Sequence, residues 1–272
     1  MFRGVVVGQY YPADSVIHEL DPRVKIAVTT LFIVVLFVAG SLYAYLLLAL
    51  FALGAIRMSR VPFGMIIRGL RPILFILVFT LVLHVFFTKG QPLFTLGPIT
   101  ASREGAIQGG LVGARLIILI ATTSLLTLTT SPISLTDGLE SILKPLQRVG
   151  VPAHELAMMM TIALRFIPTL LEEADKIMKA QMARGADFET GNLFKRAQSL
   201  VPLLVPLFVG AFRRADDLAM AMEARCYRGG QNRTRMVELK VTWKDYVALG
   251  VFAAFAVGVI VLNRVFPLGV RA

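Results

Sequence analysis

The sequence predicts an all-α integral membrane protein with about five transmembrane helices and a cytoplasmic domain of about three long amphipathic helices. The 272 residues are 56% hydrophobic, and their mean hydropathy of +0.73 is well above that of a soluble domain. Long uncharged runs alternate with basic clusters, as in membrane proteins whose cytoplasmic loops are rich in Lys and Arg. The net charge of +11 therefore indicates a multi-pass protein of the cell membrane, embedded in the lipid bilayer, and no nucleic-acid partner.

The first apolar segment, residues 26–56, is predicted to form two helices. It is uncharged for 31 residues, which is too long for one span of about 20 residues. Basic residues stand at both of its ends: Arg23, Lys25, Arg57 and Arg60. A hairpin with its turn near Gly40 and Ser41 leaves both basic ends on one side of the membrane, so two short spans are favoured. One tilted span is the alternative, and it would place the second basic pair outside.

Three further stretches have the length of a span. They are residues 72–88, about 106–130 and about 246–262. Arg115 lies in the second of them and is expected to face a protein or aqueous surface, or to extend toward the headgroups. Trp243 and Tyr246 are expected to anchor the last helix at the interface. With the N-terminus inside and five spans, all but five of the 28 Lys and Arg residues are cytoplasmic, as the positive-inside rule requires.

This topology divides the chain into residues 1–130 with four spans, a cytoplasmic segment 131–241, and residues 242–272 with the last span. The middle segment is predicted to contain three helices. They cover about residues 135–149, 153–184 and 194–227. The two longer helices have apolar residues at helical spacing on one face and charges opposite. Such helices suit a membrane surface or a helical partner.

Two short motifs end the long helices of this segment. They are Ala183-Arg184-Gly185 and Ala224-Arg225-Cys226. A cation in the last turn of a helix is favoured by the helix dipole, and the planar guanidinium suits bidentate contacts with a carboxylate. A small alanine before each arginine lets another backbone approach closely. Two arginine tips on one segment predict a partner with two equivalent sockets, although a single arginine at a helix end is often only solvated.

The caps of these two helices are predicted to differ. Gly185 directly follows Arg184, which is the position of a left-handed C-terminal cap. In the second motif Cys226 replaces the glycine. We therefore expect the second cap to move to Gly229 and Gly230, so that this helix extends further.

The sequence does not indicate catalysis or a bound cofactor. No G-x-x-x-x-G-K-[ST] motif is present to hold nucleotide phosphates, and the three histidines have no metal-ligand spacing. An intramembrane enzyme, with basic helices on lipid headgroups, is the alternative class. It would need convergent carboxylates, histidines or a nucleophile in the spans, which hold only His84, Arg115 and scattered Ser and Thr. His84 is either a proton or ligand site or a buried, hydrogen-bonded histidine.

Five segments in order along the chain carry a resemblance to a known family. They are G-Q-Y-Y-P-A-D-S-V-I-H-E-L-D-P-R-V-K (residues 8–25), R-F-I-P (165–168), A-R-G (183–185), V-P-L-L-V-P-L-F (201–208) and A-M-E-A-R-C-Y-R-G-G (221–230). With these segments the chain resembles the transmembrane T component of energy-coupling factor (ECF) transporters, the vitamin and trace-metal importers of the ABC superfamily.

The resemblance implies a non-enzymatic coupling subunit whose ATP is hydrolysed by partners. Arg184 and Arg225 would each enter a groove on one of two ABC ATPase subunits. The amphipathic helices would support one or more membrane-embedded substrate-binding (S) subunits, with Leu170 and Leu204 as expected contacts. The length and second motif look most like a module shared by several S subunits. A dedicated T component for cobalt, nickel or biotin is the alternative.

Overall fold

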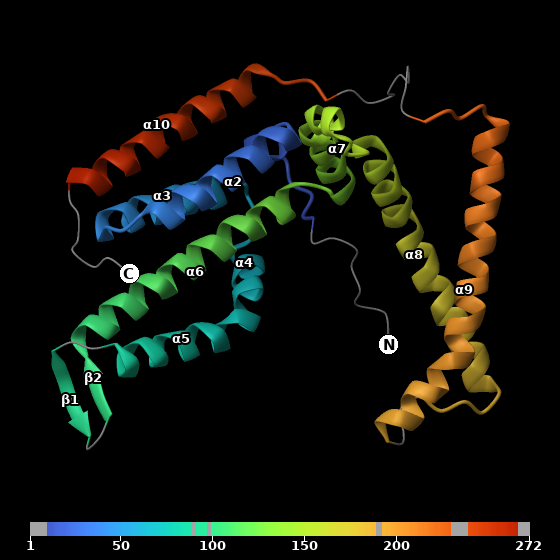
Figure 1. Ribbon diagram of the computed structural model, residues 1–272, viewed down its shortest axis with the longest axis horizontal. Coiled ribbons are helices and arrows are strands. Elements are labelled where there is room, and N and C mark those ends of the chain that lie inside the picture. The colour runs from blue at the N-terminus through green and yellow to red at the C-terminus, as the bar shows by residue number, and fades with distance from the viewer. Residues whose placement is uncertain (1–9, 89–90, 97–98, 189–191, 230–238, 266–272) are drawn as a thin grey trace. The chain divides into compact units, whose positions relative to one another are not determined.

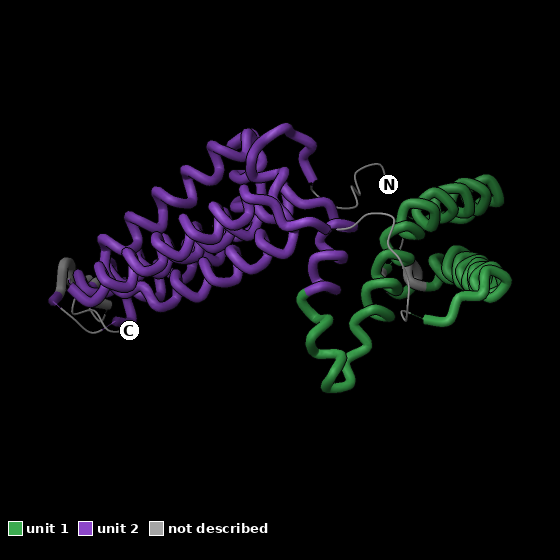
Figure 2. Tube along the Cα trace, turned by 90° about the horizontal axis from the view of Figure 1, so that it is seen from above, with its two compact units in different colours: residues 1–7, 142–237 green, residues 8–141, 238–272 purple. Residues whose placement is uncertain are grey.

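A computed structural model describes residues 10–88, 91–96, 99–188, 192–229 and 239–265 of the chain (Figure 1). The chain forms two compact units (Figure 2). One, which we call the bundle unit, contains residues 8–141 and 238–272. The other, the helix-pair unit, contains residues 142–237 with residues 1–7. The predicted all-α class is confirmed, with one small addition: a two-stranded antiparallel hairpin in the bundle unit.

The elements of the bundle unit follow one another with short connections. They are α1 (Val16–Glu19), α2 (Pro22–Val38), α3 (Leu42–Met58), α4 (Phe63–Leu70), the 3-10 turn η1 (Arg71–Ile73), α5 (Leu74–Phe87), β1 (Pro92–Leu96), β2 (Ile99–Ser102), α6 (Arg103–Thr129), α7 (Pro132–Leu143) and α10 (Trp243–Val265). The helix-pair unit holds η2 (Lys144–Val149), α8 (Ala153–Ala183) and α9 (Leu193–Ala224).

The predicted hairpin near Gly40 and Ser41 is confirmed. Helix α2 ends at Val38 and α3 begins at Leu42, and the Ser41 hydroxyl caps α3 by accepting a hydrogen bond from the Ala44 backbone N–H at 3.2 Å. Each helix has 17 residues, so each rises only about 26 Å and is just long enough to cross a bilayer.

Four described helical stretches are long and apolar enough to cross a membrane. They are Phe63–Phe87, Arg103–Thr129, Ala153–Ala183 and Trp243–Val265. The predicted span of residues 72–88 lies within the first of these stretches and coincides with α5, while α4 and η1 precede it in the same stretch. The stretch Ala153–Ala183, which is α8, is the least apolar of the four. Sequence analysis placed this helix in the cytoplasm, and that placement stays a prediction.

Hydrogen bonds at both ends of the bundle hold α10 parallel to α2. At one end the Asp21 backbone N–H donates to Oδ1 of Asp245 at 2.7 Å. At the other end Oδ1 of Asn263 accepts from the Gly40 N–H at 2.9 Å, and Nδ2 of Asn263 donates to the Val38 carbonyl at 3.1 Å. The first and last helices of a five-span protein must run in the same direction, so this pairing has the orientation that the sequence predicts.

The end of α6 joins the same cluster as the start of α2. Lys25 is buried, and its Nζ donates to the backbone oxygens of Thr129 and His18, both at 3.0 Å. The Tyr11 N–H donates to the Leu128 carbonyl at 2.9 Å. Helix α6 therefore runs antiparallel to α2. Between these ends, side chains of α2, α3, α6 and α10 form an apolar core that includes Phe32, Leu36, Leu48, Ile118, Phe252 and Val259.

A stripe of glycines lets α5 pack closely against α6, and sequence analysis missed it. Gly105, Gly109 and Gly113 recur every fourth residue of α6 and are buried. A Cβ at Gly109 would lie 3.1 Å from the Cβ of His84 and 3.3 Å from Cδ1 of Leu81. Small residues at this spacing are typical of close helix packing in membranes. The G-x-x-x-G-x-x-x-G pattern was the available signal.

We expect Gly105→Ala to destabilise the protein by roughly 1–3 kcal/mol, because the new methyl group would collide with the backbone oxygen of His84. Gly110→Ala is the matched control. A Cβ at Gly110 meets no atom within 4 Å, so this change is expected to be neutral or slightly stabilising. Thermal unfolding in detergent measures both. Equal midpoints for the two variants would contradict close packing along the stripe.

Candidate partner-binding site

Helices α8 and α9 pack antiparallel within the helix-pair unit. An ion pair of 2.5 Å joins Glu173 of α8 to Arg214 of α9, and Gly210 makes room for it, since a Cβ there would lie 3.1 Å from Oε1 of Glu173. Just beyond α9, the Tyr227 hydroxyl donates to Sδ of Met158, near the start of α8, at 3.0 Å. The end of one helix thus lies beside the beginning of the other. Figure 1 shows the pair, with a bend in α9, which contains Pro202 and Pro206.

The first arginine motif forms the cap that the sequence predicts. Arg184 is the C-terminal cap residue of α8. The Gly185 N–H donates to the Met182 carbonyl and the Ala186 N–H to the Gln181 carbonyl, both at 3.0 Å. Gly185 has a φ of +88°. This pair of bonds around a left-handed residue is a Schellman motif.

The second motif repeats this geometry at the end of α9. The Cys226 N–H donates to the Glu223 carbonyl at 2.8 Å, and the Tyr227 N–H donates to the Met222 carbonyl at 3.0 Å. Cys226 has a φ of +56°, so a cysteine takes the left-handed position that Gly185 takes in the first copy. Arg225 therefore has the same place relative to its helix as the first arginine.

The expectation that the second cap would move to Gly229 and Gly230 was wrong. Helix α9 ends at Ala224, and Cys226 closes it. The left-handed conformation costs a residue with a Cβ about 1–2 kcal/mol. Two hydrogen bonds to terminal carbonyls, together with the contact of Tyr227 on α8, offset this cost. Gly229 also has a positive φ, of +81°, but it stands beyond the cap; Gly230 lies outside the described residues.

All six residues of the two motifs are exposed. They are Ala183, Arg184, Gly185, Ala224, Arg225 and Cys226. Among the described ion pairs and hydrogen bonds, neither arginine side chain contacts a carboxylate. Because the helices run antiparallel and a helix rises 1.5 Å per residue, the two arginines lie on the order of 40 Å apart. The structure thus does not bring the two arginines together; they lie in equivalent positions at opposite ends of the helix pair.

The predicted contact residues Leu170 and Leu204 lie on the two helices of the pair. Leu170 is half-buried, and Leu204 is 44% exposed. Leu204 belongs to an exposed apolar stripe along α9, which we define as Val201, Leu204, Val205, Phe208 and Phe212. Contiguous exposed apolar surface of this kind marks a contact with lipid or with another protein.

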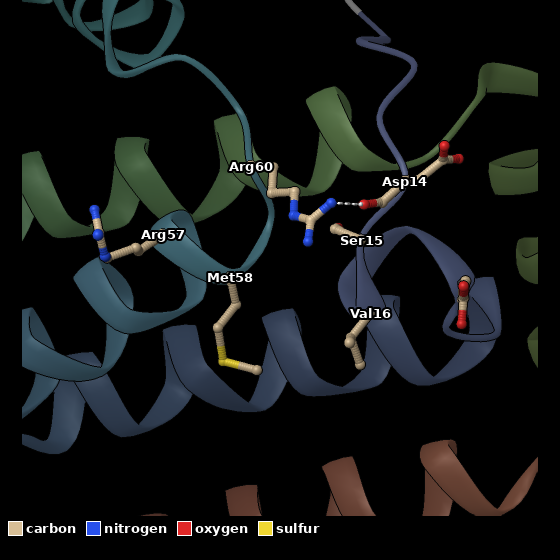
Figure 3. A pocket seen from close by; sticks show the side chains of 7 residues that line it. Asp14, Ser15, Val16, Arg57, Met58 and Arg60 are labelled. Carbon is tan, nitrogen blue, oxygen red and sulfur yellow. Dashed lines mark hydrogen bonds between the residues drawn. The ribbon is translucent and has the colours of Figure 1, made fainter.

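The bundle unit has an open pocket of about 400 Å³ where α1 meets the end of α3 (Figure 3). Its lining includes two acidic and two basic residues: Asp14, Glu19, Arg57 and Arg60. Nη1 of Arg60 donates to the Asp14 carbonyl at 3.2 Å (Figure 3). Glu19 pairs with Lys244, and the hydrogen bond from that lysine lowers the pKa of the Glu19 carboxyl. No arrangement of nucleophile and base follows from these residues.

The described histidines do not belong to a cluster that could hold a metal ion. No group of three or more His, Cys, Asp or Glu residues that could hold a metal occurs in the described part of the chain. Burial lowers the pKa of His18, whose ring bonds the Ser15 hydroxyl and the Tyr11 carbonyl. Nδ1 of His84 lies 2.9 Å from the Thr80 carbonyl of its own helix, as in a hydrogen-bonded structural histidine.

The fold defines a class: a helical membrane protein in which two exposed arginine motifs with matching caps end two long, paired helices. The family model described as cobalt transport protein (CbiQ) matches residues 13–236.

Three relatives match this chain in sequence over nearly its full length. The chain is 60% identical over 256 residues to the energy-coupling factor transporter transmembrane protein EcfT of Thermosediminibacter oceani, covering 94% of this chain and 97% of the relative. It is 54% identical over 268 residues to EcfT of Clostridium kluyveri (98% and 99%), and 49% over 258 residues to EcfT of Bacillus subtilis (93% and 97%). The chain belongs to this family, the transmembrane components of ECF transporters, and is a multi-pass membrane protein.

Because both caps contain a left-handed residue, introducing glycine at one cap and removing it from the other should have opposite effects on stability. Cys226→Gly is expected to raise stability by up to about 1 kcal/mol, because glycine adopts a positive φ without strain. Gly185→Ala, the matched reverse change, is expected to lower stability by about 1 kcal/mol. Thermal unfolding of the purified chain measures both. A shift of the same sign in both variants would show that the caps are not equivalent.

Proposed function

We propose that this chain couples ATP hydrolysis by two ABC ATPase subunits to the movement of a membrane-embedded substrate-binding subunit during vitamin or micronutrient uptake. The observation that carries the proposal is the duplicated cap: two exposed arginines with the same backbone geometry at opposite ends of one antiparallel helix pair. Membership in the ECF transporter family supports it, because such transporters are multi-subunit assemblies.

The chemistry of each cap suits a socket on a protein partner. The left-handed residue turns the chain sharply away after the arginine, so the guanidinium is exposed at a helix tip. Its planar fork fits a groove lined by carboxylates or carbonyls. Two similar ATPase subunits would offer one such groove each, and a separation on the order of 40 Å lets each subunit receive one tip.

The proposal requires the segment 131–241 to face the cytoplasm, where ATP is available. The distribution of Lys and Arg in the sequence supports that placement. The segments 1–130 and 242–272 would then contain the spans. The chain itself would hydrolyse no ATP, since it has no phosphate-binding loop.

The exposed apolar stripe of α9 is the proposed contact for the substrate-binding subunit, together with Leu170 of α8. A membrane-embedded partner brings a mostly apolar surface, which an apolar stripe can cover without leaving unpaired charges. We favour a module shared by several substrate-binding subunits, because the length of the chain and its second arginine motif look most like that type. A dedicated cobalt, nickel or biotin component is the alternative.

Removing the arginine tips is expected to uncouple the transporter. Losing one partner of a desolvated charged pair costs about 2–5 kcal/mol. Arg184→Ala or Arg225→Ala alone should therefore weaken ATPase co-purification and uptake, and the double variant should largely abolish both. Arg184→Lys and Arg225→Lys should retain only part of the ATPase co-purification and uptake, because Lys keeps the charge but lacks the planar fork of the guanidinium.

Lys179→Ala is the control for these variants. Lys179 lies one turn before the first motif and pairs with Asp175 on its own helix, so its loss should leave uptake near wild type. Normal uptake in the double arginine variant would leave the arginines as ordinary solvated helix ends.

A charge in the apolar stripe is expected to separate the two partner sites. Leu204→Glu should weaken retention of the substrate-binding subunit at least tenfold, because a carboxylate would be buried against an apolar partner, while ATPase co-purification stays unchanged. Met220→Glu is the matched control: Met220 is on α9, 61% exposed, and outside the stripe. Helical content measured by circular dichroism checks folding. Full retention in a folded Leu204→Glu variant would remove the stripe from the interface.

A further inference from the structure

Arg115 is a cation within the apolar helix α6, and aromatic side chains of the neighbouring hairpin hold it. Its Nε donates to the Tyr45 hydroxyl at 2.8 Å. The guanidinium carbon lies 5.5 Å from the centre of the Phe37 ring and 5.8 Å from the centre of the Tyr45 ring. Both distances are in the range of a cation–π contact. The position of the guanidinium is therefore fixed by α2 and α3.

Among the described residues, none supplies an anion to this cation. Glu104 is the only acidic residue between residues 26 and 131, and its carboxylate accepts from the Gln91 N–H. Within the described ranges no ion pair reaches Arg115, and Tyr45 is its described hydrogen-bond acceptor. A guanidinium has five N–H donors, and Arg115 remains partly exposed. An unpaired cation beside hydrocarbon is costly, so an anion from outside the described residues is expected.

The depth of Arg115 in the bilayer indicates which kind of anion it binds. Phe37 is the last residue but one of α2, and Tyr45 is the fourth residue of α3. The guanidinium therefore lies within about one turn of the hairpin, where these short helices end and the hydrocarbon gives way to headgroups. Phe37 is exposed, as are three apolar or aromatic residues close to Tyr45 in the chain: Leu42, Tyr43 and Leu46. Tyrosines at this level are typical of the membrane interface.

We propose that Arg115, Phe37 and Tyr45 form a binding site for the phosphate of a phospholipid, in the leaflet on the side of the α2–α3 turn. The free edge of the guanidinium donates to the phosphate oxygens as a planar fork. The exposed apolar side chains beside it accept the acyl chains. This site is separate from the arginine tips of the helix-pair unit, and it does not depend on the proposed coupling function.

The test is a titration of the purified full chain with dioleoyl phosphatidylglycerol in dodecyl maltoside, followed by native mass spectrometry. Arg115→Gln is expected to weaken the first binding step by roughly tenfold, which is what the loss of a charge-assisted hydrogen bond gives. The affinity of Arg115→Lys for phosphatidylglycerol should lie between those of wild type and Arg115→Gln. Arg264→Gln is the matched control, since Arg264 lies in the last turn of α10, next to the Asn263 that contacts the same turn. The phosphatidylglycerol affinity of Arg264→Gln should remain within about twofold of the wild-type value.

Two further ligands separate the sources of the interaction. Dioleoylglycerol, which has the acyl chains but no phosphate, should bind wild type and Arg115→Gln equally. Millimolar inorganic phosphate should not displace the lipid, because the acyl chains contribute to binding. Displacement by inorganic phosphate would overturn a lipid site in favour of a free-anion site. A difference in dioleoylglycerol affinity between wild type and Arg115→Gln would also overturn the proposal.

A second variant keeps the test valid if Arg115→Gln does not fold. Tyr45→Phe keeps the charge and both rings but removes the acceptor that orients Nε, so a several-fold loss of phosphatidylglycerol affinity is expected with helical content unchanged. If Arg115→Gln does not fold, Arg115→Lys and Tyr45→Phe decide the matter, and wild-type affinity in both contradicts the site. Unchanged lipid affinity in Arg115→Gln with loss of a co-purified membrane partner would assign the anion to a protein carboxylate instead.

Discussion

Antiparallel packing of α8 against α9 is the constraint on which the placement of both arginine tips depends. The Glu173–Arg214 ion pair and the contact of Tyr227 with Met158 fix this direction. Both motifs end a helix, so a parallel pair would bring the arginines together at one end. In the antiparallel pair they lie at opposite ends, which suits two partners that bind side by side. An ion pair between these helices thus matters less for its own energy than for the register it specifies.

The bundle unit depends on a different constraint, because backbone groups in a bilayer must find partners inside the protein. Helix α10 meets this need at both ends of α2. Asp245 and Asn263 are 18 residues apart, about 27 Å along a helix, and α2 has 17 residues. One carboxylate and one amide therefore satisfy the terminal groups of α2 and fix α10 parallel to it. This arrangement brings the basic ends of the spans to one side.

Features governed by local chemistry could be predicted from the sequence. The turn at Gly40 and Ser41 and the left-handed cap at Gly185 follow from residues next to one another in the chain. The cap at Cys226 could not be predicted, because Tyr227 packs against a helix about 70 residues earlier and outweighs the preference for glycine. The aromatic contacts of Arg115 likewise need the spatial neighbours Phe37 and Tyr45.

Site-specific photocross-linking tests most directly the central claim, that the two helix ends bind two different subunits. A benzoylphenylalanine would replace Ala183 in one variant and Ala224 in another, within the assembled transporter, with the same group at Lys179 as control. The account predicts that positions 183 and 224 each label one ATPase subunit, and that a chain with both groups forms a product carrying two. Labelling of one and the same ATPase molecule from both positions would contradict the account, as would no labelling at either position while the ATPases co-purify.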